Sequence, residues 1–373
     1  MTVIAETVPL DLVGSEPATV PEPLALAEVS GSNGVAVIGA GIAGLACARR
    51  LAGAGIPVRL FDKGREVGGR VATHWAEPHH FDHGAQYFTA RDERFQPLVE
   101  GWIAAGIVAS WTGPIVVLGS TPNAAGASSH AAGGDTRYVG VPGMSAIGRA
   151  LAVGLTVETG IRVTGLACDE DRWRLVGVEG AATEPRDLGV FGRVVVAIPS
   201  PLAADLLRSV APDLAARAAV ARMEACWAVM AVYDQPLALD FAGAFVERSP
   251  LAWVARDATK PRRAATETVI LHGAGDWSEA HLEDPPERVV EALLDAFAAA
   301  IGRPLPRPTS VMAHRWRYSR SLAPLGVAAM VDPHLGLALC GDWVLGGRVE
   351  EAYLSGLAAA DQLIVGSGDG VAP

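Results

Sequence analysis

Residues 35–44 read VAVIGAGIAG, and this segment is the strongest indication of the fold in the sequence. The apolar run at residues 35–38 is typical of a central parallel strand that is buried on both faces. Residues 43–54 have helical character, and residues 57–61 form a second short strand. The segment therefore predicts a β-α-β unit with short connections.

The turn at residues 39–44 has the GxGxxG pattern. Gly39 permits the tight turn, Gly41 lets backbone amides approach a pyrophosphate, and Gly44 lets the helix pack closely on the strand. The helix N-terminus then offers N–H groups and a partial positive charge to the phosphates. Asp62 closes the second strand about 20 residues later, where a carboxylate binds a ribose hydroxyl. Alone, the glycines could form a simple tight turn; in register with strand, helix and acid they predict dinucleotide binding.

Two further turns favour FAD over NAD. Residues 68–70, GGR, allow a second close approach of backbone to the nucleotide, and Arg70 can lie beside the pyrophosphate. Residues 340–343, CGDW, can place Asp342 against the ribityl hydroxyls, and the N-terminus of the helix that follows can stabilise reduced flavin. A solvated Arg and a helix-capping Asp are the structural alternatives. Because both signals fit one cofactor, together they predict FAD.

The composition limits the class of protein. The chain has 373 residues, of which 50% are hydrophobic and 19% charged, which is enough for roughly two domains. Its net charge of −11 argues against a nucleic-acid surface. The longest charge-free run, residues 101–134, is too rich in Gly, Ser and Asn for a membrane span. Four scattered cysteines and an acidic leader at residues 1–33, without basic residues and expected to be disordered, predict a cytoplasmic protein.

The remaining chain alternates short strands with helices. Hairpin strands are predicted at residues 157–166 and 173–178, further strands at 193–198, 227–233, 268–272 and 335–340, and helices at 202–223, 286–301 and 349–364. This order predicts an α/β protein with a Rossmann-like FAD-binding domain and a second α+β substrate domain that carries a mixed or antiparallel sheet. We expect residues 34–80, 136–200 and 305–366 in the first domain, 81–135 and 201–304 in the second, and a disordered tail at 367–373.

Residues 81–92, FDHGAQYFTARD, carry a narrower similarity. With RYVG (137–140), PGM (142–144), AIP (197–199), RWRY (315–318) and GDW (341–343), they resemble the renalase-like flavoproteins, a branch of the amine-oxidase and p-hydroxybenzoate-hydroxylase-like FAD superfamily. The resemblance extends over residues 34–366. The chain departs from the family's pattern in its acidic leader, in Asp62 where Glu is common, and in a Gly/Ala-rich loop at residues 122–135.

The resemblance implies non-covalent FAD and the residues around it. The implied FAD contacts are Gly39, Gly41, Ala43, Gly44, Asp62, Lys63, Gly69, Arg70, Val163, Gly341, Asp342 and the Val349 amide. Gln86, His272 and Trp316 match positions near the isoalloxazine ring, and no residue is assigned a catalytic role. Taken alone, His272 and Trp316 equally suit packing in a core.

The resemblance also implies a reaction. Renalase-like proteins oxidise dihydronicotinamide isomers, 2- or 6-dihydro-NAD(P), by hydride transfer to flavin N5, and O2 then reoxidises the flavin to give NAD(P)+ and H2O2. A dihydropyridine expels hydride with its own nitrogen lone pair, so the protein must only orient two rings. Two alternatives remain: an FAD-dependent oxidase or dehydrogenase of a small amine or biosynthetic intermediate, and a flavin-binding protein without catalysis.

Some other side chains allow more than one interpretation. Lys63 lies in the nucleotide motif and Lys260 in a Pro/Arg-rich loop, so neither suits the lysine that amine oxidases often place near flavin N5. The three arginines of residues 315–320 either bind substrate phosphates or are solvated. The histidines of residues 79–83 lack a carboxylate or cysteine at ligand spacing, so no metal site is predicted.

Overall fold

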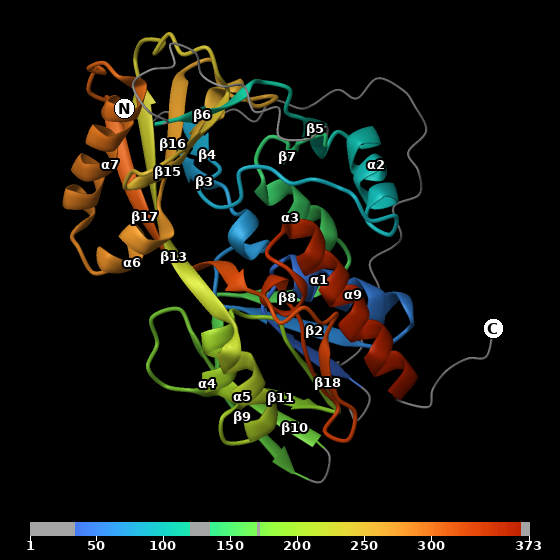
Figure 1. Cartoon of the computed structure of the whole chain (residues 1–373). Coiled ribbons are helices and arrows are strands. Elements are labelled where there is room, and N and C mark those ends of the chain that lie inside the picture. The colour runs from blue at the N-terminus through green and yellow to red at the C-terminus, as the bar shows by residue number, and fades with distance from the viewer. Residues whose placement is uncertain (1–33, 120–134, 170–171, 367–373) are drawn as a thin grey trace, which may run out of the picture.

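A computed structural model describes residues 34–119, 135–169 and 172–366 and arranges them around two six-stranded sheets (Figure 1). The predicted α/β class, with a Rossmann-like part and a second part that carries a mixed sheet, is confirmed. The expected leader, the tail and nearly all of the Gly/Ala-rich loop lie outside the described residues. Within those ranges, no helix combines the length and hydrophobicity that crossing a membrane requires.

The first sheet has the strand order β18-β19-β12-β1-β2-β8 and is parallel except at its edge strand β18. Its strands are β1 (Val35–Ile38), β2 (Val58–Asp62), β8 (Thr156–Thr159), β12 (Arg193–Val196), β18 (Met330–Asp332) and β19 (Leu337–Leu339). All four residues of β1 are buried, which explains why its sequence is hydrophobic without alternation. The glycine turn therefore follows the carboxyl end of an inner strand.

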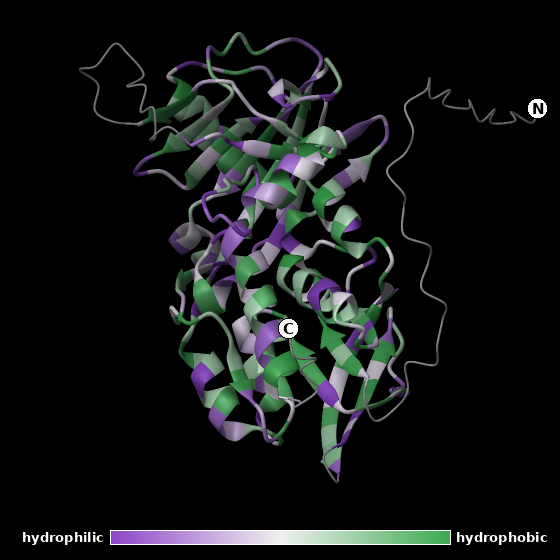
Figure 2. Cartoon of the chain, turned by 90° about the vertical axis from the view of Figure 1, so that its right-hand side faces the viewer, coloured by the Kyte–Doolittle hydropathy of each residue, from purple (hydrophilic) through white to green (hydrophobic). Residues whose placement is uncertain are grey.

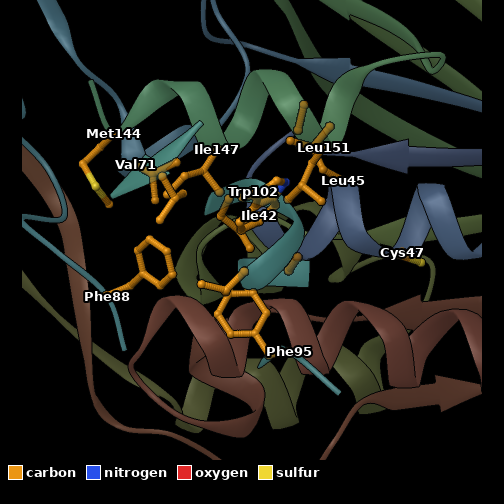
Figure 3. Close-up of a cluster of buried hydrophobic side chains, with 14 of the residues drawn as sticks. Ile42, Leu45, Cys47, Val71, Phe88, Phe95, Trp102, Met144, Ile147 and Leu151 are labelled. Carbon is orange, nitrogen blue, oxygen red and sulfur yellow. The ribbon is translucent and has the colours of Figure 1, made fainter. Parts of the chain in front are cut away.

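Helices cover both faces of this sheet. On one face lie α1 (Ile42–Gly53), α3 (Ser145–Ala152) and α9 (Val349–Gly366), and on the other α4 (Ser200–Leu207) and α5 (Pro212–Val220). Figure 3 shows part of the first core, in which side chains of α1 and α3 meet Phe88, Phe95 and Trp102. The helix α9 approaches α1 so closely that a Cβ on Gly356 would lie 2.2 Å from the carbonyl oxygen of Ala43.

The second sheet has the order β17-β13-β16-β15-β14-β6 and is antiparallel except for the pair β14 and β6. Its strands are β6 (Ile115–Leu118), β13 (Arg222–Tyr233), β14 (Gly243–Val246), β15 (Leu251–Arg256), β16 (Glu267–Gly273) and β17 (Ser310–Ala323). Alternate residues of β13 point to opposite faces of the sheet. Val229 packs under α7 (Pro286–Ile301), whereas Met230 joins the core of the first layer, which the first sheet forms with its helices. In Figure 2, the strands of both sheets are largely green, which marks hydrophobic residues. Purple, hydrophilic residues occur in the region between the two sheets.

Smaller elements complete the fold. They are the antiparallel sheet β9 (Ile161–Asp169), β10 (Arg172–Glu179) and β11 (Arg186–Phe191), the ribbons β3 (His74–Ala76) with β4 (His79–Phe81) and β5 (Val108–Ser110) with β7 (Tyr138–Gly140), the helices α2 (Gln96–Ala104), α6 (Gly275–Ala280) and α8 (Asp342–Leu345), and the 3-10 turns η1 (Gly69–Val71) and η2 (Asp257–Thr259).

The structure differs from the predicted elements in three places. The helix expected at residues 202–223 is two helices, because Pro212 has no N–H to donate and begins α5 as a separate helix. The first hairpin strand is divided between β8 in the first sheet and β9, with Gly160 between them at φ +74°. The strand β17 pairs with β13 in the second sheet, although its residues were expected in the FAD-binding domain. The helices α4 and α5 pack on the first sheet, although residues 201–304 were expected in the substrate domain. The domain division itself stays a prediction.

Candidate functional site

The glycine turn after β1 leaves free space next to the N-terminus of α1. Gly41 is the N-cap of α1, and a Cβ added to it would meet no heavy atom within 4 Å, so its backbone borders free space. A Cβ on Gly44 would lie 1.9 Å from the carbonyl oxygen of Gly39, so only glycine allows this start of the helix. The first-turn amides, including that of Ala43, have no acceptor within the helix. This geometry suits a phosphate ligand.

Asp62 ends β2 beside this turn, as predicted. Its carboxylate accepts hydrogen bonds from the backbone amides of Ala40 and Gly64, each at 2.6 Å. Burial raises the pKa of Asp62, and the two amides and the neighbouring Lys63 act against this rise. Lys63 itself is exposed. Asp62 therefore joins the two loops that flank the expected adenosine end of the site.

The GGR turn packs directly on the glycine turn. The amide of Gly68 donates to the carbonyl of Ala40 at 2.8 Å, and Gly68 forms an isolated parallel bridge with Gly41. A Cβ on Gly69 would lie 3.3 Å from the Cα of Gly41. The two glycine motifs are about 25 residues apart in the sequence. In the structure they form one surface.

Arg70 joins this surface to the other end of the chain. Its guanidinium forms a two-pronged ion pair with Asp342, with Nη1 to Oδ2 at 2.8 Å and Nη2 to Oδ1 at 2.6 Å. Nη1 also donates to the carbonyl of Ser319 at 2.9 Å. Asp342 is 6% exposed and begins α8 directly after Gly341. The convergence of the two ends was predicted, but the pairing of Arg70 with Asp342 was not.

The remaining expected contacts lie along the same edge of the first sheet. Val163 is in β9, whose start is tied to the Asp62 loop by a hydrogen bond from the Gly160 amide to the Gly64 carbonyl at 2.7 Å. Val349 begins α9, which packs on α1 and follows the Gly341 turn. Free space at Gly41, helix-end amides and one carboxylate at the end of β2 are the features that hold a dinucleotide, so the residues fit FAD.

Two of the three expected pocket residues meet at the backbone carbonyl of His83, and the third lies beside them. This oxygen accepts from Trp316 Nε1 at 2.9 Å and lies 3.1 Å from His272 Nε2. Gln86 Nε2 lies 3.5 Å from His272 Nε2. The Trp316 ring stacks on the His83 ring with centroids 5.1 Å apart. The structure therefore brings Gln86, His272 and Trp316 into one group, with His83 at its centre.

This group touches the nucleotide surface through Gly84. A Cβ on Gly84 would lie 2.1 Å from the carbonyl oxygen of Arg70 and 3.5 Å from Cζ2 of Trp316. The amide of Ala85 donates to the same Arg70 carbonyl at 2.9 Å. The loop that carries Gln86 is consequently the bridge between the FAD side and the second sheet.

The imidazoles of this group are uncharged at neutral pH. Burial, together with three neighbouring histidines, lowers the pKa of His83 to about 3. Burial lowers the pKa of His272 to about 4, and the charge of Lys260 acts in the same direction. His314, which meets His83 edge-on at 4.6 Å, also has a lowered pKa because of burial. The wall beside the bridge is thus aromatic and neutral.

Sequence reasoning missed a buried ion cluster behind this wall. Lys260 Nζ lies 2.6 Å from Asp257 Oδ1 and 3.1 Å from Asp82 Oδ2, and Arg263 pairs with both acids. Lys260 does lie in the Pro/Arg-rich loop, but it is 2% exposed and contacts the expected pocket residue Gln86. The available signal was that the sequence contains only two lysines, Lys63 and Lys260.

The three arginines of β17 have carboxylate partners. Arg315 and Arg317 pair with Glu283, at 2.7 and 2.6 Å, and Arg320 pairs with Glu224 at 2.6 Å. Side chains alternate along a strand, so Arg315 and Arg317 point away from the face that carries Trp316. Among the residues that the structure describes, no group of three or more His, Cys, Asp or Glu side chains could hold a metal ion.

A chain with this nucleotide surface and second sheet is an FAD-dependent oxidoreductase. Residues 37–102 match the NAD(P)-binding Rossmann-like domain, and residues 123–364 match the flavin containing amine oxidoreductase family. Since the second match spans more than half of the chain, the protein belongs to the flavin containing amine oxidoreductases, and FAD is its cofactor.

Solved structures share the fold at low sequence identity. A protein assigned as a protoporphyrinogen oxidase from Exiguobacterium sp. 255-15 has a TM-score of 0.70 at 14% identity, over 89% of this chain and 98% of that chain. An engineered putrescine oxidase has a TM-score of 0.67 at 16% identity, over 89% and 98%. Cyclohexylamine oxidase from Brevibacterium oxydans IH-35A has a TM-score of 0.65 at 17% identity, over 88% and 98%. These likenesses concern the fold alone.

Proposed function

We propose that this protein is an oxidase of dihydronicotinamide isomers, 2- or 6-dihydro-NAD(P). Bound FAD supplies the hydride acceptor, flavin N5, and O2 with a solvent proton takes up the electrons, leaving NAD(P)+ and H2O2. The protein's own side chains then have to hold an uncharged ring in place and exclude water from it.

The neutral aromatic wall is the observation that carries this proposal. His83 and Trp316 stack on each other in nearly parallel planes, at 26°, and neither ring carries a charge at neutral pH. His272 stays unprotonated at neutral pH because burial depresses its pKa. A dihydropyridine ring is planar and uncharged, so it gains contact with such a wall without losing the hydration of a charge.

An alkylammonium substrate lacks a free counter-ion here. The nearest described carboxylates behind the wall, Asp82 and Asp257, already neutralise Lys260 and Arg263. An amine would therefore have to lose its proton before it entered, and the buried ammonium of Lys260 would repel any cation that remained. Charge balance beside the wall thus favours a substrate whose reacting ring is uncharged.

The FAD contacts of the proposed enzyme follow the two glycine turns and the C-terminal segment. Backbone amides of the first turn of α1 bind the pyrophosphate, Asp62 the adenosine ribose, and the N-terminus of α9 the flavin. The complete proposed set is Gly39, Gly41, Ala43, Gly44, Asp62, Lys63, Gly69, Arg70, Val163, Gly341, Asp342 and Val349, with Gln86, His272 and Trp316 on the substrate side.

The test is the visible spectrum of the purified protein under anaerobic conditions. Borohydride-made dihydronicotinamide isomers are expected to bleach the flavin band rapidly, whereas ordinary 4-dihydro NADH is not. Admitting air should restore the band and release H2O2. A flavin band that the isomers leave unchanged would refute the proposed substrate.

The family itself favours a second candidate, an oxidase of a small amine or biosynthetic intermediate. Putrescine oxidase and cyclohexylamine oxidase share the fold, and Lys260 is buried next to the pocket residue Gln86. Bleaching of the flavin by a panel of amines, but not by the isomers, would identify this second function.

A further inference from the structure

We propose that Lys260 is a positioning residue: held between Asp82 and Asp257, its ammonium fixes the side-chain amide of Gln86 in a single orientation at the flavin site. This inference rests on the proposed function because it takes Gln86 to lie beside the flavin. It does not depend on which substrate reduces the flavin.

Apart from His272 Nε2, which lies 3.5 Å from Gln86 Nε2 and can donate or accept, each end of the Gln86 amide has partners of one kind only. Lys260 Nζ donates to Gln86 Oε1 at 3.4 Å, and Gln86 Nε2 donates to the carbonyl oxygens of Asp82 and Gly84, the latter at 3.0 Å. An ammonium can only donate and a carbonyl can only accept, so turning the amide over would break all three contacts. Without the ammonium, the amide oxygen would lose its partner and the orientation would no longer be fixed.

The cluster also ties Gln86 to both layers of the molecule. Asp82 accepts from the Met144 amide and the Thr73 hydroxyl of the first layer, each at 2.8 Å, while Lys260 comes from the second. Burial acts to raise the pKa of Asp82, but the charges of Lys260 and Arg263 and these hydrogen bonds outweigh it, so its pKa lies below the usual value. Asp82 is therefore ionised and holds the ammonium in place.

Stability alone does not account for such a cluster. Removing four charged groups from water costs free energy that their attraction only partly returns, and apolar residues often replace buried ion pairs without loss of stability. The same cluster does give one defined geometry to the loop that carries Gln86. This follows because an ammonium or guanidinium group can only donate hydrogen bonds and a carboxylate can only accept them. A role in positioning explains the cluster's location directly behind the bridge.

The second sheet offers a matched control. Arg256 and Glu267 form a two-pronged ion pair with both distances at 2.7 Å and with side chains 18% and 5% exposed. Arg256 also donates to the Leu239 carbonyl at 2.6 Å, on the far side of the sheet from the His83 group. Glu267→Gln thus perturbs a buried ion pair beside η2 without touching Gln86.

The experiment is a double-mutant cycle on the FAD-loaded protein with Lys260→Met, Gln86→Met and the double variant. The measured quantity is the dissociation constant for sulfite, a nucleophile that adds to flavin and bleaches its visible band without being a substrate. Each single variant is expected to shift this constant at least about fivefold, and the double variant no further than either single one. Glu267→Gln should stay within about twofold of the unmodified protein.

Two outcomes would overturn the inference: a Lys260→Met protein that holds FAD with an unchanged sulfite constant, or fully additive effects in the double variant. If Lys260→Met fails to retain FAD, the cycle is run with Lys260→Gln, which keeps one donor group and should give a smaller, still non-additive shift. If the isomers fail to bleach the flavin while the sulfite cycle is non-additive, the proposed substrate is wrong and the role of Lys260 stands.

Discussion

The nucleotide side of the site is built from backbone, whereas the substrate side is built from buried side chains. On the first side, glycines set the geometry: the Cβ position of Gly44 is occupied by the Gly39 carbonyl, and that of Gly41 is empty. On the second side, Gln86, His272 and Trp316 come from three distant segments: His272 and Trp316 meet at one carbonyl oxygen, and Gln86 lies beside His272. A site built from backbone leaves no room for a side chain where a ligand or a carbonyl group must approach. A site built from side chains depends on neighbouring residues to hold each side chain in its orientation.

Gly44→Ala should have the largest effect. The added methyl group would lie 1.9 Å from the Gly39 carbonyl oxygen, so the turn or the helix start must move. We expect the FAD dissociation constant to rise at least about 100-fold, measured by fluorescence titration of the apoprotein. The matched control is Gly53→Ala in the last position of α1, where nothing lies within 4 Å and binding should be unchanged. Full FAD occupancy in Gly44→Ala would contradict the account of the backbone side.

Asp342→Asn should have the next largest effect. It removes the charge that balances Arg70 in a pair whose carboxylate is 6% exposed. FAD affinity should fall about tenfold, or about 1.4 kcal/mol. As a control, Asp361→Asn breaks the exposed pair with Arg50 and should change affinity by less than about twofold. Equal effects of the two variants would show that the Arg70 pair has no special role in FAD binding.

Trp316→Phe tests the side-chain half of the comparison. Phenylalanine can keep the stack on His83 but cannot donate to its carbonyl oxygen, a hydrogen bond of 2.9 Å. Flavin reduction by dihydronicotinamide isomers should slow by roughly fivefold, with a stability loss of about 1 kcal/mol. Stopped-flow absorbance and urea unfolding measure the two effects. Trp75→Phe, at a position 41% exposed, should alter neither.

The last expected effect is on the pH dependence of stability. His272 has a folded pKa of about 4 against an ordinary value of 6.5, so below pH 6.5 the unfolded chain takes up a proton that the folded protein does not. Stability should therefore decrease as pH falls from 7 to 5, and His272→Gln should lose less stability than the unmodified protein, by up to about 2 kcal/mol. Urea unfolding at both pH values measures the difference. An identical pH loss in the variant would mean that His272 is protonated in the folded state.

The same contrast explains what the sequence could reveal. The strand, the glycine turn and the acid at residues 35–62 interact within one short segment, so their spacing in sequence predicts their arrangement in space. Pro286–Ile301 was predicted with the same bounds because its hydrophobic face and its first proline are local features. The Arg70–Asp342 pair joins residues 272 positions apart, and the Lys260 cluster depends on how two sheets pack. No local pattern encodes such contacts.

The most direct test of the proposed function compares two substrate classes on one protein. Anaerobic flavin reduction is measured by stopped flow with borohydride-made dihydronicotinamide isomers and, in parallel, with putrescine and cyclohexylamine. The account predicts that the isomers bleach the flavin band rapidly and the amines slowly or not at all, because the wall is neutral and the nearby carboxylates Asp82 and Asp257 are already paired. Rapid bleaching by the amines, with the isomers inert, would contradict it.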